Sequence, residues 1–185
     1  MTKIKKRYIK DSEFKNMVHT IGSMLTPLTS NWQPDYIVGI TRGGLYPALL
    51  LSHYLDVPMH TLNVSLRDND VGPESNLWMS EDAFGYHRTD DLPGYSNPDL
   101  RKNILIVDDI NDSGATFNWI MDDWCSSCMP NDPVWNGIWG NNVRFAAVID
   151  NQASECRVKM NYRGIAIDKS MKDEWIVFPW EKDFK

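Results

Sequence analysis

Two neighbouring acidic residues at the end of an apolar run are the strongest chemical feature of the sequence. The segment Ile104–Thr116 reads ILIVDDINDSGAT, so Asp108 and Asp109 follow four aliphatic residues. Such a run predicts a buried strand, and ligands of open α/β sheets bind at the carboxyl ends of strands. Paired carboxylates there can bind ribose hydroxyls, or Mg²⁺ through water. The small, hydroxylated residues 112–116 lead into a predicted helix, whose first N–H groups form a phosphate cradle.

A second segment with anion-binding chemistry follows an earlier apolar run. Residues 38–47 read VGITRGGLYP and place Thr41, Arg42 and the pair Gly43-Gly44 between a predicted strand and a predicted helix. Two glycines allow backbone amides to approach an anion closely. The segment therefore predicts a second anion site near the first.

The C-terminal residues 173–181, DEWIVFPWE, combine aromatic and acidic side chains. From the residues alone, this run indicates a hydrophobic C-terminus that packs on the core; a resemblance described below gives it a second interpretation.

The elements that must position these residues follow from hydrophobic periodicity. Apolar residues at helical spacing predict helices over 12–25, 45–55 and 117–124. Short apolar runs predict strands over 36–40, 58–65, 104–107, 144–149 and 164–167. This alternation indicates an α/β fold with a mostly parallel twisted sheet flanked by helices. All 185 residues are expected to form one domain, because domains contain roughly 100–200 residues.

Three segments are predicted to lie outside regular structure. Residues 66–100 are rich in Gly, Pro and acids, and we expect a long flexible loop of the kind that forms functional lids. Residues 129–142 are rich in Pro, Gly, Asn and Trp and are interpreted as an insertion. Residues 108–116 are expected to form the loop between the acidic strand and its helix.

Composition and charge exclude several classes of function. With 42% hydrophobic and 24% charged residues, the chain has the composition of an ordinary soluble globular protein. Its net charge of −6 disfavours nucleic acid as a partner, and the basic first ten residues are expected to be a solvated end. No apolar run approaches the roughly 18–20 residues of a membrane span, and no secretory signal is seen. We therefore expect a cytoplasmic protein without a membrane partner.

The three cysteines do not form a recognisable metal or redox site. Cys125 and Cys128 make a CxxC motif, but structural zinc needs four ligands and the four His residues all lie well upstream. The motif also ends a predicted helix, whereas a thioredoxin-type motif opens one. We expect Cys125, Cys128 and Cys156 to be ordinary reduced thiols.

Taken together, these motifs resemble type I phosphoribosyltransferases, most closely the 6-oxopurine enzymes for xanthine, guanine or hypoxanthine. Residues 104–116 resemble the signature that binds phosphoribosyl pyrophosphate (PRPP), residues 38–47 the pyrophosphate loop, and residues 173–181 the hood over the base. The resemblance covers about residues 34–181. It implies the type I phosphoribosyltransferase fold, with a core over about 34–168, a flexible loop over about 66–100 and a C-terminal hood over about 169–185.

The same resemblance implies an activity. The chain is expected to transfer the 5-phosphoribosyl group from PRPP to a nucleobase in purine salvage, with Mg²⁺ as cofactor and pyrophosphate as the second product. Its substrates would be PRPP and a base, and the chain is expected to assemble as a homo-oligomer, a dimer or a tetramer.

Individual residues acquire roles from the resemblance. Asp112 is the catalytic candidate, because it occupies the place of the family's general base near the purine N7 proton. The expected contacts are Asp108, Asp109, Asp112, Ser113, Gly114, Ala115 and Thr116 for PRPP; Thr41, Arg42, Gly43 and Gly44 for pyrophosphate; Asn151, Trp175 and Ile176 for the base; and Asp108, Asp109 and Glu181 for the metal.

Two positions depart from the family pattern. The usual Ser-Tyr pair of the flexible loop is Ser65-Leu66 here, and the following Arg67 is expected to reach pyrophosphate. The Lys that usually donates to the purine 6-oxo group follows the strand over 144–149, where this chain has Asp-Asn-Gln with Asn151 nearest to that position. An Asn amide both donates and accepts, so we expect looser or shifted base selectivity.

Two alternative functions stay open. One is a regulator with this fold that senses PRPP or a nucleotide and binds a partner. The other is an enzyme of the same chemistry that acts on a pyrimidine or another base.

Overall fold

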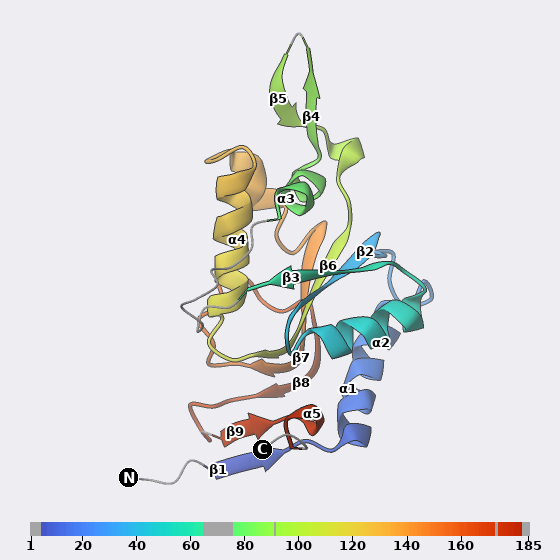
Figure 1. Cartoon of the computed structure of the whole chain (residues 1–185), viewed down its shortest axis with the longest axis vertical. Coiled ribbons are helices and arrows are strands. Elements are labelled where there is room, and N and C mark those ends of the chain that lie inside the picture. The colour runs from blue at the N-terminus through green and yellow to red at the C-terminus, as the bar shows by residue number, and fades with distance from the viewer. Residues whose placement is uncertain (1–4, 65–75, 91, 173, 183–185) are drawn as a thin grey trace.

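A central sheet of five parallel strands organises the molecule (Figure 1). The computed structural model describes residues 5–64, 76–90, 92–172 and 174–182. The strand order is β3-β2-β6-β7-β8. The strands are β2 (Tyr36–Thr41), β3 (Met59–Asn63), β6 (Ile104–Asn111), β7 (Val143–Asn151) and β8 (Tyr162–Ile167). The expected α/β fold with a mostly parallel sheet is therefore confirmed.

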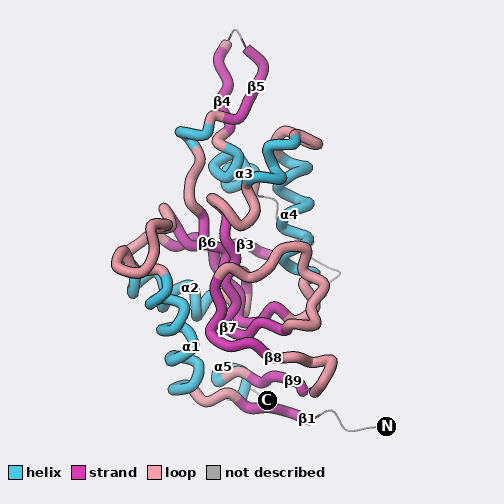
Figure 2. Tube along the Cα trace, turned by 180° about the vertical axis from the view of Figure 1, so that it is seen from behind, coloured by secondary structure: helices cyan, strands magenta, loops and turns pink. Residues whose placement is uncertain are grey.

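Helices cover both faces of this sheet (Figure 2). Helices α1 (Asp11–Met24) and α2 (Leu45–Leu55) pack on one face, and α3 (Leu77–Phe84) and α4 (Ala115–Ser127) on the other. In β6, Leu105 and Val107 join the apolar cluster of α1 and α2, whereas Ile104 and Ile106 join that of α4. Consecutive strand residues point to opposite faces, so a strand covered on both sides needs an unbroken apolar run.

A small second sheet joins the two ends of the described chain. Strand β1 (Lys5–Tyr8) pairs in parallel with β9 (Glu174–Val177), and α5 (Pro179–Lys182) follows. Lys5 lies opposite Glu174, with 3.5 Å between the ammonium nitrogen and the carboxylate oxygen. Residues 5–8 thus form a strand whose backbone pairs with β9, while most of their side chains stay exposed, as expected for a solvated basic end.

The expected flexible loop over 66–100 is wrong for the residues of 76–100 that the structure describes. They form α3, the hairpin of β4 (Tyr86–Thr89) and β5 (Leu92–Ser96), and the short helix η1 (Pro98–Leu100). The hairpin extends away from the central sheet (Figure 1). Helix α3 is held by tertiary contacts. Phe84 is fully buried, and the centroid of its ring lies 5.3 Å from the ring centroid of Trp135. Residues 65–75, with Ser65 and Arg67, lie outside the described residues.

Two other segments are also more ordered than expected. β6 continues through both acidic residues to Asn111, so only 112–114 separate it from α4. The supposed insertion over 129–142 contains η2 (Pro133–Gly137) and contributes to the core, because Trp135 and Ile138 are buried. The indole N–H of Trp135 donates to the Cys128 carbonyl at 2.9 Å. Aromatic packing therefore compensates for the weak periodicity of this segment.

The cysteines and the lengths of the helices are two further features of the fold. Cys125, Cys128 and Cys156 are free thiols, and burial raises the pKa of Cys128 to about 11. Among the described residues, no helix is long and apolar enough to cross a membrane.

Candidate active site

The acidic pair lies on β6, near its carboxyl end, where it is partly buried. Burial raises the pKa of Asp108 well above its ordinary value, and the negative charge of Asp109 adds to the rise. Burial likewise raises the pKa of Asp109 to about 7, with a smaller contribution from the charge of Glu181. In the described part of the chain, no Lys, Arg or His forms an ion pair with either carboxyl. The pair is therefore suited to receive a metal ion or hydroxyl donors from a ligand.

The loop after β2 packs directly against this pair. β2 and β6 are neighbours in the sheet, which places residues 41–44 beside Asp109. A Cβ atom on Gly43 would overlap the Asp109 carboxyl, so only glycine allows this close approach. Thr41 donates from its hydroxyl to the Asn63 side chain at 3.0 Å, and Arg42 is exposed. The predicted pyrophosphate loop and the predicted PRPP acids thus form one site.

Adding a methyl group at Gly43 tests this packing. We expect Gly43→Ala to lower PRPP turnover at least about 10-fold, because the loop or the Asp109 carboxyl must move, and to destabilise the fold by about 1–3 kcal/mol. Steady-state kinetics and thermal unfolding measure the two effects. Gly137→Ala is the matched control, since a Cβ at Gly137 would meet no atom within 4 Å. Unchanged PRPP kinetics in Gly43→Ala would contradict the assignment of this loop.

The loop between β6 and α4 has the form of a phosphate cradle. Gly114 has a φ of +85°, and a Cβ there would overlap the backbone nitrogen of Cys156. The carbonyl of Ser113 accepts from the N–H of Glu155 at 3.0 Å, and the Ser113 hydroxyl accepts from the N–H of Ala115 at 3.3 Å. The loop is therefore held by the segment after β7, and it leads into the N-terminus of the 13-residue helix α4.

Asp112 meets a cation that sequence reasoning missed. The Lys169 ammonium lies 2.7 Å from Oδ1 of Asp112, and the two side chains are 15% and 38% exposed. Lys169 follows β8, six residues before Trp175 in the chain. The only sequence signal was a Lys close to the aromatic C-terminal segment.

The side chain of Asn151, which was expected to contact the base, bonds to backbone groups of the chain itself. Asn151 is 5% exposed, and its amide donates to the Asp112 carbonyl at 2.8 Å. Its Oδ1 accepts from the backbone N–H groups of Ala153 at 3.2 Å and Lys169 at 3.0 Å. Both ends of the amide are therefore used within the chain.

The C-terminal segment brings Glu181 toward the acidic pair. The Glu181 carboxylate accepts from the N–H of Phe178 at 2.9 Å, and its charge contributes to the raised pKa of Asp109. On β9, Trp175 is 43% exposed and Ile176 is buried. In the described residues, no group of three or more His, Cys, Asp or Glu side chains is arranged to hold a metal by itself. A metal at Asp108 and Asp109 would thus take further ligands from substrate or water.

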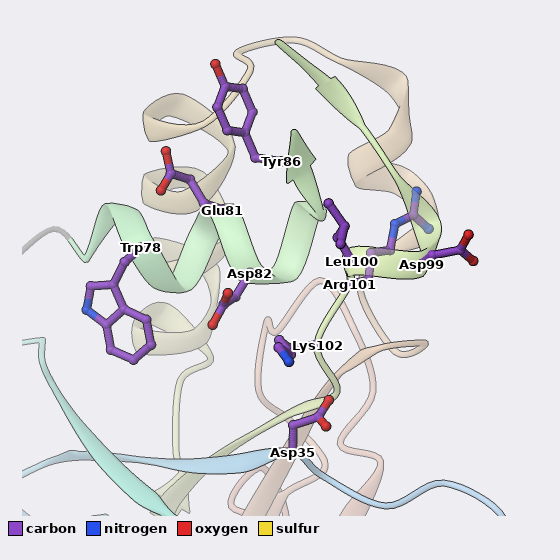
Figure 3. A pocket seen from close by; sticks show the side chains of 9 residues that line it. All are labelled: Asp35, Trp78, Glu81, Asp82, Tyr86, Asp99, Leu100, Arg101 and Lys102. Carbon is purple, nitrogen blue, oxygen red and sulfur yellow. The ribbon is translucent and has the colours of Figure 1, made fainter. Parts of the chain in front are cut away.

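A separate cavity of about 580 Å³ lies at the amino ends of the strands, whereas the site on β6 lies near their carboxyl ends. Asp35 directly precedes β2 and Lys102 lies two residues before β6, so this cavity is at the amino ends of these strands. Figure 3 shows Asp82 of α3 pointing toward Lys102 and Asp35, with Trp78 on the same helix. None of these residues was singled out from the sequence, and none belongs to the site on β6.

Comparison with known proteins identifies the family. Residues 13–184 match the family described as the phosphoribosyl transferase domain. The chain belongs to this family. This phosphoribosyltransferase is 24% identical over 178 residues to xanthine phosphoribosyltransferase 1 of Saccharomyces cerevisiae, which covers 84% of the chain and 81% of the relative. It is 28% identical over 163 residues to the xanthine-guanine phosphoribosyltransferase of a Ruegeria species. This alignment covers 85% of the chain and 73% of the relative.

Solved structures show the same fold. A purine phosphoribosyltransferase from Pyrococcus horikoshii superposes with a TM-score of 0.58 at 22% identity, with 96% of this chain and 95% of that chain covered. The Helicobacter pylori xanthine-guanine-hypoxanthine enzyme gives a TM-score of 0.55 at 17% identity, with 96% and 95% covered. The phosphoribosyltransferase described here is thus most like the 6-oxopurine members, as the sequence motifs predicted.

Proposed function

We propose that the enzyme transfers the 5-phosphoribosyl group from PRPP to a 6-oxopurine and releases pyrophosphate, in a Mg²⁺-dependent reaction of purine salvage. The observation that carries this proposal is the packing of Gly43 against the Asp109 carboxyl. It joins an anion-binding loop to an acidic pair, and these two features suit the pyrophosphate and the ribose of one substrate. Relatives named for xanthine and guanine support the class of base.

In this proposal each loop binds a different part of PRPP. Asp108 and Asp109 accept from the ribose hydroxyls, residues 113–116 bind the 5-phosphate, and residues 41–44 hold pyrophosphate. The bond between C1′ and the pyrophosphate oxygen breaks with its electron pair on pyrophosphate, and a purine nitrogen forms the new bond to C1′. The proton from that purine passes to the carboxylate of Asp112, which acts as general base.

The donor set fits Mg²⁺. Asp108 and Asp109 are partly buried carboxyls without a cationic partner among the described residues, and Glu181 adds charge near Asp109. Asp108 and Asp109 would hold the ion together with oxygens of PRPP and water, and Glu181 would add negative charge near them. When bound, Mg²⁺ supplies charge neutralisation for pyrophosphate. Trp175 is proposed to stack on the purine, and the backbone around Ile176 to bind its edge.

Pyrophosphate release from PRPP and Mg²⁺, measured across a panel of bases, tests the proposed function. We expect turnover with hypoxanthine, guanine or xanthine, and little with adenine, uracil or orotate. Turnover restricted to a pyrimidine would replace the proposed base class, and the absence of turnover with every base would favour a regulator. Light scattering tests the expected dimer or tetramer, and fractionation of the source cells tests the cytoplasmic location.

A further inference from the structure

Asn151 joins three segments that are distant in the chain. As the last residue of β7, it donates to the carbonyl of Asp112 after β6 and accepts from the N–H of Lys169 after β8. The neighbouring N–H of Gln152 donates to the carbonyl of Ile167 at 2.7 Å. The loops that follow three adjacent strands are thus tied together at one side chain.

These hydrogen bonds fix the backbone position of Lys169 and thereby the place of its ammonium group. Its backbone is held by Asn151, and its ammonium lies 2.7 Å from the carboxylate of Asp112. Lys172, three residues later, pairs instead with Glu174 at 3.1 Å and is 65% exposed. Of these two lysines on the β8–β9 connection, only the one anchored by Asn151 reaches the residue that we propose as general base.

A buried network of polar side chains surrounds Asp150, the residue before Asn151. Asp150, the preceding residue, is 5% exposed and accepts from Asn111 at 2.9 Å, Gln152 at 3.1 Å and Arg163 at 3.2 Å. Asn111 also donates to Ser154 at 2.9 Å. Side chains from β6, β7 and β8 therefore fix the strand ends on which Asn151 sits. A buried network with its donors placed in this way restricts the position of its members.

We propose that Asn151 is a positioning residue that holds the Lys169 ammonium at Asp112, and that Lys169 thereby sets the preference for a base with a hydrogen-bond acceptor at the edge facing Asp112. This inference rests on the proposed function. An ammonium donates and cannot accept, so a carbonyl oxygen of the base satisfies it whereas an amino group opposes it. The Lys169 side chain is only 15% exposed, so its ammonium cannot readily bond to water instead. A base without an acceptor at that edge therefore binds less favourably.

Variants of the two residues test the inference through selectivity rather than activity alone. We expect Lys169→Gln to lower the ratio of kcat/KM for hypoxanthine over adenine by about 10- to 100-fold, because a charged hydrogen bond is lost. The KM for PRPP should change less than about threefold. Lys172→Gln, which removes a lysine from the same connection, is the matched control and should keep the wild-type ratio.

A double-mutant cycle separates positioning from simple support of the fold. Asn151→Ala should lower the same ratio by about 10-fold in the wild-type background and leave it unchanged in the Lys169→Gln background. Lys169→Arg, which keeps the charge, should restore part of the preference. If Asn151→Ala lowers the unfolding temperature but keeps the ratio, or if the two changes act additively, Asn151 does not act through Lys169.

Equilibrium binding of product nucleotides keeps this inference distinct from the proposed function. GMP and AMP differ in whether the 6-position accepts or donates, and calorimetry measures their affinities without turnover. We expect the preference for GMP in the wild-type enzyme to be lost in Lys169→Gln. If the wild-type protein shows no turnover but prefers GMP, and Lys169→Gln loses that preference, the Lys169 assignment is supported while the proposed reaction is overturned. An unchanged preference in an active enzyme would overturn the Lys169 assignment alone.

Discussion

Replacing both acidic residues of β6 by asparagine is expected to abolish most PRPP turnover and to leave the protein folded. We expect Asp108→Asn combined with Asp109→Asn to lower kcat/KM for PRPP by about 10³-fold or more, since both carboxylates would contact ribose and metal. Neither carboxyl has a cationic partner among the described residues, so the folded chain loses no ion pair. Pyrophosphate release and circular dichroism measure the two outcomes. Near-native turnover would show that the site is assigned to the wrong residues.

The same double variant should be more stable than the wild-type protein at neutral and alkaline pH. Burial raises the pKa of Asp109 to about 7, so between its ordinary value and pH 7 the native state binds more protons than the unfolded state. Stability therefore falls as the pH rises through this window, by on the order of 4 kcal/mol, and asparagine removes that dependence. Thermal unfolding at pH 5 and pH 8 should show the larger gain at pH 8. Asp90→Asn, at an exposed position, serves as the control.

Asparagine at position 112 should affect the chemical step more than substrate binding. We expect Asp112→Asn to lower kcat by about 10²- to 10⁴-fold with a smaller change in the KM for PRPP, because an amide cannot take the purine proton. The variant keeps the backbone carbonyl that Asn151 binds, so the loop should stay in place.

Steady-state kinetics with saturating base separate the two parameters. Asp122→Asn is the matched control, because Asp122 also forms a 2.8 Å ion pair, with Arg157, but on the exposed face of α4. An effect confined to KM would assign Asp112 to binding and would require another general base.

Local sequence determined the five strands of the central sheet, helices α1, α2 and α4, and the two loops that we propose bind anions. The apolar run 104–107 predicts a buried strand because each of its residues must face one covered side of the sheet. The acids and glycines of 108–116 and 41–44 then lie near or just beyond the carboxyl ends of β6 and β2, and parallel strands bring those ends to one edge. These features depend on residues that are close in the chain, so pattern and spacing suffice to predict them.

Tertiary structure alone decided which side chains meet. Helix α3 has only eight residues, and its stability comes from the burial of Met79 and Phe84 rather than from a long periodic pattern. Strand β1 exists because β9, about 170 residues later, supplies its hydrogen-bond partners. Asn151 occupied the expected position in the chain, but its amide is used by Asp112 and Lys169. The physical reason is the same in each case: the partners come from distant segments, and the folded backbone, not the local sequence, determines which of several available donors and acceptors lies within bonding distance.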